Sequence, residues 1–377
     1  MNIHLYPSGL KNESRILKIV HSLNKYQTFE EIVVLGKMTP GLRYQEVVKD
    51  GIRLIRLKPI FGSRLNGTLG KVFTTIGWYL AVLFWIRSRK INCLNCHSLP
   101  VLALSVFIKI WKSCTLIYDT HELETETNGM RGLIQYFSKR LERRLIKSVD
   151  AVCVVNHSIA DWYKKNYCLE YVWVVHNAPY QMGAMPKRKG LLRKAIGVQD
   201  HELLFIYQGL LSSGRGIEIL LKVFSNSGIN THVVFMGYGP NESLVRQAAM
   251  CNPNIHFMPA VSPKLVFDYT VDADVGISLI EHTCLSYYLC APNKLYEYAA
   301  CGVVPIVSNF PEMSSFIDKY DCGWKIEPTA VALSNLLKSI DKETIAIKKV
   351  NALDAGAQHC WENEEKELMR MYKSLKL

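Results

Sequence analysis

The sequence lacks the marks of several protein classes. Its longest apolar run, Val72 to Ile86, holds fifteen residues, whereas a membrane-spanning helix needs about 20. The first residues, MNIHLYPSG, contain neither a charged segment followed by an apolar one nor a small-residue cleavage site. No internal repeat with a period of about 20 to 50 residues is evident. We therefore expect a chain that is not exported and whose 11 cysteines are reduced.

Two cofactor motifs are incomplete. Cys93-Leu-Asn-Cys96-His97 fits the C-x-x-C-H pattern for haem attachment, but proteins that carry haem in this way are exported. A zinc site would need a second pair of ligands, and the sequence contains no other C-x-x-C. We therefore interpret the two cysteines as small buried strand residues and predict no metal site and no cofactor. His97 is a separate candidate, because it stands at the carboxyl end of the predicted strand.

What is present is an ordinary globular composition with an excess of positive charge. Of the 377 residues, 49% are hydrophobic and 21% are charged, which suffices for a full core, and the length favours two domains or one large one. The 45 Lys and Arg outnumber the 33 Asp and Glu, so the formal net charge is +12. Such a charge favours a polyanionic partner or an anionic membrane face. We interpret Val72–Ile86 as a core helix, with contact to a membrane surface as the alternative.

Short β-rich runs alternate with longer helical patterns along the chain. This alternation predicts an α/β protein with doubly wound parallel sheets covered by helices. The predicted strands are Ile3–Tyr6, Glu31–Leu35, Ile52–Leu57, Asn92–Cys96, Thr115–Tyr118, Ala151–Val155, Val172–Val175, Leu203–Tyr207, His232–Met236, Ile255–Met258, Val275–Leu279 and Val304–Val307. The predicted helices include Glu13–Tyr26, Leu99–Trp111, Leu133–Lys147 and five that begin near Arg215, Asn241, Pro263, Pro292 and Pro311.

A stretch punctuated by proline and glycine, Asn177–Gly190, separates two such patterns. We predict an N-terminal domain over residues 1–177, a linker at 178–190, a C-terminal domain over 191–358 and a final helix within 359–377 that packs on either domain. Ligands of such sheets bind outside the carboxyl ends of the strands. The loops that follow strands are therefore the places to look for chemistry.

Glycine turns follow two strands of the second half. Gly209-Leu-Leu-Ser-Ser-Gly214-Arg215-Gly216 nearly matches the phosphate-binding G-x-x-x-x-G-K-[ST] loop, with Arg215 at the Lys position and Gly216 in place of the hydroxyl residue. A glycine turn that brings an Arg to a helix start suits a diphosphate, although a plain strand-to-helix turn also uses glycine. Gly237-Tyr238-Gly239-Pro240 would let a nucleotide approach the backbone closely.

The most informative stretch lies just beyond Ala291. Pro292 is expected to open a helix, so that Asn293, Lys294 and Glu297 project from one side of its first turns. A cation at a helix start suits a phosphate, and a carboxylate one turn further suits a ribose diol. The alternative is a surface Glu–Lys pair that contributes little.

In the first half, Tyr118-Asp-Thr-His121-Glu122 ends a predicted strand. His121 is a catalytic candidate because Asp119 and Glu122 stand beside it at a carboxyl edge; a solvated structural loop is the alternative. Tyr6-Pro-Ser-Gly9 follows the first strand, where a small residue lets the backbone approach a ligand.

Together these segments resemble the retaining glycosyltransferases of family 4, whose GT-B fold has two facing Rossmann-like domains. The resemblance covers nearly the whole chain. Its motifs, in order, are the Gly9 loop, Asn95-Cys-His97, Tyr118 to Glu122, Val175-His-Asn177-Ala-Pro, Tyr207-Gln-Gly209 to Arg215-Gly216-Ile-Glu, Met236 to Pro240, and Pro292-Asn-Lys-Leu-Tyr-Glu297 with Gly302 and Pro305. Two positions depart from it, since Leu210 stands where the family usually has Arg and Leu289 where its E-x7-E pair has the first Glu.

The resemblance implies a hexosyltransferase-like enzyme that needs no metal and moves a sugar from a nucleotide diphosphate sugar to a hydroxyl, with retention at the anomeric carbon. The implied catalytic residues are His121, Arg215, Lys294 and Glu297. The implied donor-binding residues are Gly9, Gly209, Arg215, Gly216, Tyr238, Gly239, Asn293, Lys294, Leu295 and Glu297. His97, Glu122 and Asn177 are the residues implied for the acceptor or the cleft.

The resemblance also implies a cellular setting. We expect biosynthesis of a cell-surface glycan (capsule, O-antigen or exopolysaccharide) on a lipid-linked or oligosaccharide acceptor. The protein would be cytoplasmic and peripheral at the inner membrane, with an anionic membrane surface rather than nucleic acid as its partner. Six basic residues between Arg131 and Lys147, against the single acid Glu142, support the expectation of an anionic membrane surface as partner. The alternatives are a non-hydrolysing nucleotide-sugar epimerase of the same architecture and a non-catalytic basic membrane-binding protein.

Overall fold

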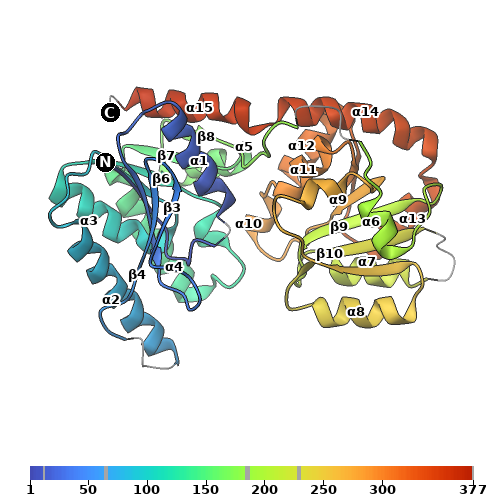
Figure 1. Cartoon of the computed structure of the whole chain (residues 1–377), viewed down its shortest axis with the longest axis horizontal. Coiled ribbons are helices and arrows are strands. Elements are labelled where there is room, and N and C mark those ends of the chain that lie inside the picture. Colours follow the sequence, from blue (N-terminus) through green and yellow to red (C-terminus); the bar gives the residue numbers. More distant parts are fainter. Residues whose placement is uncertain (12, 63–66, 183–186, 227–230, 376–377) are drawn as a thin grey trace. The chain divides into compact units, whose positions relative to one another are not determined.

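The computed structural model describes residues 1–11, 13–62, 67–182, 187–226 and 231–375. Residues 183–186 of the predicted linker and 376–377 of the predicted final helix lie outside this description. The chain divides into two compact units (Figure 1). Unit 1 comprises Met1–His176 with Glu365–Leu377, and unit 2 comprises Asn177–Glu364.

Unit 1 is built on an eight-stranded sheet in the order β3-β4-β2-β1-β5-β6-β7-β8. Neighbouring strands run parallel, except that β3 pairs antiparallel with β4 at the edge. The strands are β1 (Asn2–Leu5), β2 (Ile32–Lys37), β3 (Gln45–Lys49), β4 (Ile52–Leu57), β5 (Cys93–Cys96), β6 (Thr115–Asp119), β7 (Ala151–Val154) and β8 (Trp173–Val174). The helices are α1 (Ser14–Lys25), α2 (Gly67–Ile86), α3 (Leu102–Lys112), α4 (Gly132–Leu145) and α5 (His157–Tyr167), with short 3-10 helices at Leu99–Val101, Glu124–Glu126 and Ile146–Ser148.

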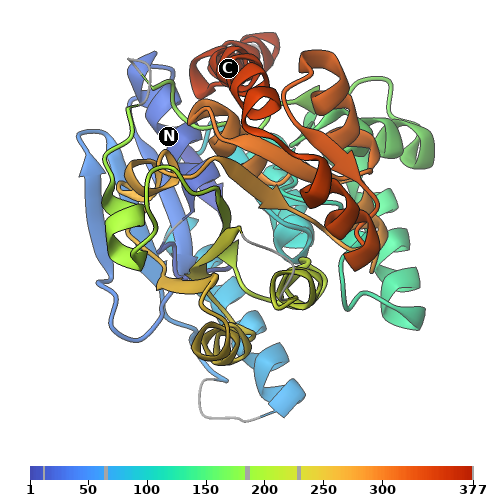
Figure 2. The ribbon, with the colours of Figure 1, turned by 90° about the vertical axis from the view of Figure 1, so that its right-hand side faces the viewer.

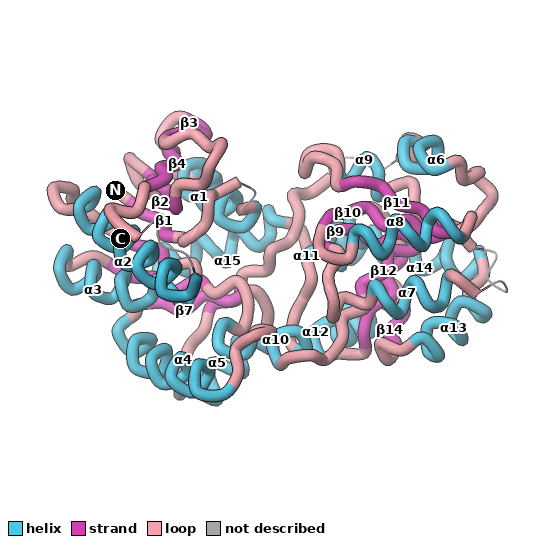
Figure 3. The backbone as a smooth tube through the Cα atoms, turned by 90° about the horizontal axis from the view of Figure 1, so that it is seen from below, coloured by secondary structure: helices cyan, strands magenta, loops and turns pink. Residues whose placement is uncertain are grey.

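Unit 2 is built on a parallel six-stranded sheet in the order β11-β10-β9-β12-β13-β14, with helices on both faces (Figures 2 and 3). Its strands are β9 (Leu204–Leu210), β10 (His232–Tyr238), β11 (Ile255–Pro259), β12 (Val275–Ser278), β13 (Val304–Ser308) and β14 (Trp324–Ile326). Its helices are α6 (Leu191–Ile196), α7 (Ile217–Phe224), α8 (Glu242–Cys251), α9 (Val266–Thr270), α10 (Leu285–Tyr288), α11 (Asn293–Ala300), α12 (Pro311–Tyr320), α13 (Ala330–Ser339) and α14 (Lys342–Gln358). The last helix, α15 (Trp361–Ser374), begins in unit 2 and continues into unit 1.

The central strands of both sheets are buried along nearly their whole length, as expected for parallel strands covered on two faces, although β1 carries the polar Asn2 and His4. All twelve strands predicted from the sequence are confirmed, most within one or two residues at each end. Two edge strands were not predicted. β3 is exposed and polar, so it carries no apolar alternation, and β14 has only three residues.

The helix α2 corrects the interpretation of the apolar run as a core helix. Trp78, Val82 and Ile86 are buried, whereas Leu69 and Val72 are at least half exposed. The helix packs on β4, and the indole Nε1 of Trp78 donates a 3.0 Å hydrogen bond to the Gly36 carbonyl. In the described part of the chain, α2 alone is long and apolar enough to cross a membrane. Of its apolar stretch Leu69–Ile86, 28% is buried. The helix therefore covers the sheet with one side and leaves apolar side chains on the other.

Candidate functional site

Each sheet has a point where the strand order reverses, and the predicted site residues follow the strands at these points. In unit 2, β9 is followed on one side by β10 and paired on the other with β12. In unit 1, β1 lies between β2 and β5. Loops that leave the carboxyl ends of strands at such a point diverge and leave room for a ligand.

Two cations meet at the unit 2 edge. Arg215 lies in the turn between β9 and α7, and Lys294 lies in the first turn of α11. Lys294 is 7% exposed and its Nζ is buried without a hydrogen-bond partner, as is the Nε of Arg215. Burial and the nearby Arg215 lower the pKa of Lys294 well below 10.5. An unpartnered buried cation is unfavourable for the fold by itself, so this arrangement suits an anion that arrives from outside.

Aromatic rings hold both cations. The Lys294 Nζ lies 3.5 Å from the centroid of the Tyr207 ring, and the Arg215 guanidinium carbon lies 5.3 Å from that of Tyr287. A ring face attracts a cation without neutralising it. Tyr207 is in turn fixed by its hydroxyl, which donates a 2.8 Å hydrogen bond to the Leu210 carbonyl. The rings therefore position the two charges while leaving them available to a ligand.

Glu297 lies one turn beyond Lys294 and is half-buried. Its Oε2 accepts a 2.5 Å hydrogen bond from the Nε2 of Gln208, whose Oε1 accepts a 2.7 Å bond from the Thr270 hydroxyl. The carboxylate is thus oriented by a residue of β9. The alternative of a surface Glu–Lys pair is wrong, because Lys294 is buried; Asn293 is the exposed member of the group.

The glycines of this edge have a packing role that the sequence did not reveal. A Cβ at Gly239 would lie 2.4 Å from the Leu211 carbonyl oxygen, and one at Gly216, where φ is +74°, would lie 2.8 Å from the Leu279 side chain. The two strand-end loops therefore pack backbone against backbone, and the Leu211 N–H donates a 2.7 Å bond to the Tyr238 carbonyl. Gly209 adopts a φ of +110° beside them, and the Tyr238 side chain is exposed.

The expectation for Leu295 needs a correction. Its side chain is 1% exposed and belongs to the apolar core, where it packs with Met313 and Phe316. Its backbone N–H is also committed, because it donates a 2.9 Å hydrogen bond to the Pro292 carbonyl. Leu295 therefore anchors α11 to the apolar core, and its side chain is not available to a donor.

The unit 1 edge gathers two histidines around one carboxylate. Asp119, the last residue of β6, accepts a 2.9 Å bond at Oδ2 from the Nδ1 of His97, and the Nε2 of His121 lies 3.5 Å from the same oxygen. Arg15 of α1 donates to Asp119 through Nε and through Nη2, the latter at 2.6 Å. Burial opposes ionisation of Asp119, yet Arg15 and the bonds from His121 and His97 hold its pKa well below the usual value.

The other residues predicted in unit 1 lie around this cluster. His121 is 22% exposed at its side chain and packs 5.4 Å from the Tyr6 ring, whereas His97 is fully buried. Glu122 is exposed. Asn177 is half-buried and is the first residue of unit 2. Gly9 packs on the chain after β2, since a Cβ there would lie 2.6 Å from the Thr39 hydroxyl oxygen.

The histidine cluster also has the composition of a metal site. His97, Asp119 and His121 each offer a ligand atom, and these atoms lie within 4.8 Å of one another. However, the Arg15 guanidinium already neutralises the carboxylate at contact distance. A metal ion bound there would face that cation in a low-dielectric environment. We therefore interpret the cluster as a hydrogen-bonded network.

Several residues of both edges were missed by the sequence analysis. Tyr207 and Gln208 opened one motif of the family resemblance but were given no role at the site, and Arg15 was treated only as part of a helical pattern. A cation on an apolar helix face is a usable signal for Arg15, because buried charges are normally paired. No comparable signal marks Gln208, whose partners come from α9 and α11.

The two halves of the chain match two families of known proteins. Residues 28–178 match Glycosyltransferase Family 4, and residues 189–359 match Glycosyl transferases group 1. No curated protein sequence matches the chain.

Solved structures share the fold over the whole chain. Sucrose-phosphate synthase from Thermosynechococcus elongatus is 14% identical, with a TM-score of 0.82 over 100% of this chain and 99% of its own. HepE of Anabaena, solved with UDP-glucose, is 12% identical, with a TM-score of 0.72 and 99% of each chain covered. WaaG, a glycosyltransferase involved in lipopolysaccharide biosynthesis, is 12% identical, with a TM-score of 0.66 and 98% of each chain covered. The two family matches, on the fold shared with these structures, identify the chain as a GT-B glycosyltransferase of the family 4-like type.

Proposed function

We propose that the protein is a hexosyltransferase-like enzyme that moves a sugar from a nucleotide diphosphate sugar to an acceptor hydroxyl with retention at the anomeric carbon. The observation that carries this proposal is the pair of unpartnered cations, Arg215 and Lys294, at the reversal point of the unit 2 sheet. Negative charge develops on the leaving diphosphate, and fixed cations stabilise it best where water is excluded. The same two charges make a metal ion unnecessary for that step.

The donor is tested by calorimetry with UDP, ADP and GDP, without divalent metal. A diphosphate should bind, and Arg215→Gln should weaken that binding by about tenfold or more, because a charge-assisted hydrogen bond is worth about 1.5–3 kcal/mol. Arg246→Gln is the matched control, since Arg246 is an exposed residue of α8 that pairs with Glu242. Equal affinities in wild type and Arg215→Gln would contradict the assignment.

We further propose that the acceptor is a lipid-linked or oligosaccharide component of a cell-surface glycan, such as capsule, O-antigen or exopolysaccharide. The support is the fold shared with WaaG together with the surface of α4. Transfer of labelled sugar from the donor into a solvent-extractable lipid would support this acceptor, and NMR of the new linkage would report its anomeric configuration. Isomerisation of the nucleotide sugar without any acceptor would instead favour an epimerase.

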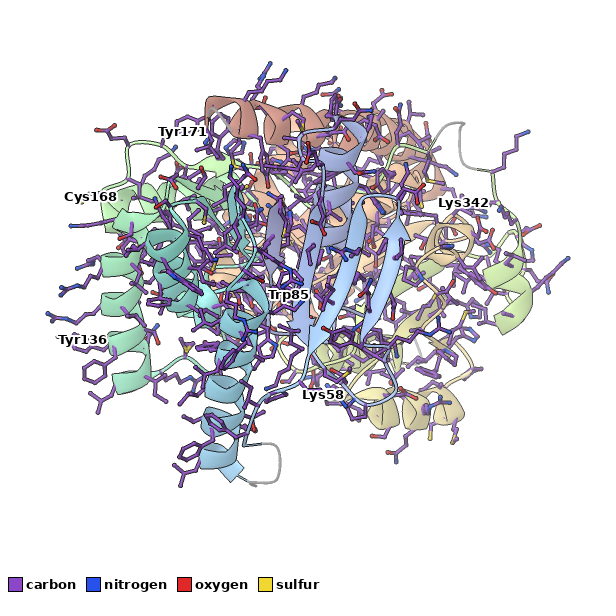
Figure 4. All side chains as sticks on the ribbon, turned by 60° about the vertical axis from the view of Figure 1, so that its left-hand side comes forward. Lys58, Trp85, Tyr136, Cys168, Tyr171 and Lys342 are labelled. Atoms are coloured by element: carbon purple, nitrogen blue, oxygen red, sulfur yellow. The ribbon has the colours of Figure 1, made fainter. Side chains whose placement is uncertain are left out.

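The exposed surface of α4 supports a membrane partner. Glu142, the single acidic residue between Arg131 and Lys147, is fully buried. The exposed side of α4 therefore carries the basic residues Arg140, Arg143 and Arg144 but not this acid. Large apolar side chains share that side: Leu133, Ile134, Tyr136, Phe137 and Leu141 are each 47% to 74% exposed. Tyr136 projects away from the ribbon in Figure 4. A helix that exposes both basic and apolar side chains suits the headgroup region of an anionic membrane.

We therefore propose peripheral attachment at the cytoplasmic face of the inner membrane, through charge and shallow insertion together. Flotation with anionic vesicles should lift the wild-type protein at low salt, and high salt should release most of it. Arg140→Gln with Arg144→Gln should remove the salt-sensitive part, whereas Ile134→Ser with Phe137→Ser should lower binding at every salt concentration. Lys338→Gln in α13 is the control. Flotation that ignores lipid charge would contradict the proposal.

A further inference from the structure

The turn that carries Arg215 is held from both sides by one acidic residue of a neighbouring loop. Glu281 follows β12, and its backbone N–H donates a 2.9 Å hydrogen bond to the Gly214 carbonyl. Its side-chain Oε1 accepts a 3.3 Å hydrogen bond from the Gly216 N–H. Gly214 and Gly216 are the residues on either side of Arg215. The carboxylate of Glu281 is therefore fixed beside the Arg215 turn.

The loop around Glu281 is tightly bonded and packs against the same turn. The Thr283 N–H donates a 2.7 Å hydrogen bond to the Glu281 carbonyl, so Glu281 is held through its N–H, its carbonyl and its side chain. A Cβ at Gly214 would lie 3.3 Å from the Tyr287 ring. Tyr287 is also the ring that faces the Arg215 guanidinium. The connection between β12 and α11 therefore positions both the carboxylate and the cation.

The Glu281 carboxylate keeps its charge close to the two cations without bonding to them. The Arg215 Nε and the Lys294 Nζ have no hydrogen-bond partner among the described residues, so neither atom bonds to Glu281. Gly216 stands at the start of α7, and the positive end of a helix favours a negative charge at this place. The half-buried carboxylate is therefore a negative group held at the edge of a site built for a diphosphate.

Glycosyl transfer needs a negative group near the sugar as well as cations near the leaving group. When the bond between the anomeric carbon and the diphosphate oxygen breaks, its electron pair stays on that oxygen and the sugar becomes positively charged. The acceptor oxygen bonds to the same carbon, and its proton passes to the leaving diphosphate. Fixed cations stabilise the leaving diphosphate, whereas a fixed carboxylate stabilises the sugar. Arg215 and Lys294 meet only the first of these needs.

We propose that Glu281 is a catalytic carboxylate that stabilises the positive charge on the anomeric carbon of the transferred sugar. This inference rests on the proposed glycosyl transfer. Leu289 stands where the E-x7-E pair has its first Glu, so that position offers no carboxylate. Glu281 supplies one from eight residues earlier in the same β12–α11 connection.

The variant Glu281→Gln removes the charge and keeps the shape of the side chain. Its amide oxygen can still accept from the Gly216 N–H, so the turn should stay intact. We expect kcat to fall by about 100-fold, as for the loss of one preorganised electrostatic contact. Diphosphate affinity should be unchanged or higher, because a negative charge beside Arg215 and Lys294 is gone. Wild-type kcat, or a loss of diphosphate affinity as large as the loss of kcat, would overturn the proposal.

A second variant, Glu281→Asp, separates the charge from the hydrogen bond. The shorter side chain keeps the carboxylate but draws it away from the Gly216 N–H. If the charge acts on the sugar, Glu281→Asp should keep a higher kcat than Glu281→Gln. If Glu281 only holds the turn, the order of the two variants is reversed, and that result would overturn the proposal. Glu218→Gln is the matched control, because Glu218 is an exposed acid in the first turn of α7 and should be dispensable for kcat.

The turnover is measured without a known acceptor, because water can take the place of the acceptor hydroxyl. The probes are UDP-glucose, ADP-glucose and GDP-mannose, and the readout is the slow release of the nucleoside diphosphate. A wild-type protein that binds a diphosphate but releases none from any of the three donors would overturn both proposals. Release by the wild type together with the same kcat in Glu281→Gln would overturn only the role of Glu281.

Discussion

At the scale of single residues, we expect the unpartnered Lys294 to lower the stability of the unliganded protein and to raise its affinity for a diphosphate. Its ammonium is buried beside Arg215 without a hydrogen-bond partner, and replacing such a group by an apolar one of similar shape is neutral or stabilising. We therefore expect Lys294→Met to raise the melting temperature of the unliganded protein while weakening diphosphate binding by about tenfold or more. A lower melting temperature with unchanged affinity would contradict this.

The same residue gives a pH dependence with a definite sign. The pKa of Lys294 is lower in the folded chain than its ordinary value of 10.5, so between these two values the unfolded chain binds more protons. Stability then rises with pH across that window. Urea unfolding at several pH values should show this rise in the wild type and not in Lys294→Met. Parallel curves for the two proteins would exclude the effect.

Glu297 has a separate expected role, as ligand of the ribose. Gln208 holds one carboxylate oxygen at 2.5 Å and so fixes the group at the edge of the sheet. Glu297→Gln should lower the affinity for a nucleoside diphosphate by about tenfold, which corresponds to the loss of one charge-assisted hydrogen bond. The affinity for the 2′,3′-dideoxy analogue should hardly change. Calorimetry with both ligands makes the comparison, and equal losses would count against a ribose contact.

At the scale of elements, a buried carboxylate, together with contacts of Gln135 and Lys139 to Glu126, holds α4 to unit 1. Glu142 accepts 2.7 Å hydrogen bonds from the hydroxyls of Tyr118, Tyr163 and Tyr167. Glu142→Ala leaves three buried hydroxyls without that partner, at about 1–3 kcal/mol for each unsatisfied group. Urea denaturation should show a loss of several kcal/mol, with Arg144→Ala, an exposed neighbour, as control. A loss no larger than that of the control would show that α4 is held otherwise.

Glu142 also has a pH signature opposite to that of Lys294. Burial, only partly offset by the three tyrosines, raises its pKa above 4.5. The folded chain then binds more protons than the unfolded one between 4.5 and the raised value, so this contribution to stability falls as pH rises through that window. Glu142→Gln should lack the fall. Unfolding curves collected between pH 4 and 8, about the range that such buried acids reach, make the comparison.

At the scale of the whole molecule, the C-terminal residues complete unit 1. Leu368, Met371 and Tyr372 of α15 are at most 2% exposed, and Glu365 pairs with Lys25 at 2.6 Å. Each fully buried apolar side chain is worth about 1.5–3 kcal/mol, so their sum is comparable with the stability of a domain. A chain that ends at residue 364 should therefore show faster hydrogen exchange in β1 and β5 but unchanged exchange in β10 and β12. Uniform exchange in the two units would contradict this division.

The strands were predictable because their pattern is local. Ala151–Val154 is a short apolar run between turn residues, and a buried parallel strand needs nothing more. The order of site segments along the chain was equally visible, since the loops after strands carry them. Edge strand β3 was not predicted because it is polar and exposed. Its pairing with β4 cannot be recognised from the residues of β3 alone.

The sequence by itself determined the α/β class, the twelve main strands, the positive charge and the residues that stand at strand ends. Only the tertiary structure decided which of these residues act together. Lys294 is buried over Tyr207, Leu295 joins the core, Glu142 leaves the surface of a basic helix, and Tyr372 of the last helix bonds to Asn95 of β5. The physical reason is that burial and hydrogen-bond partnership depend on residues far apart in the chain, whereas strand and helix patterns depend on near neighbours.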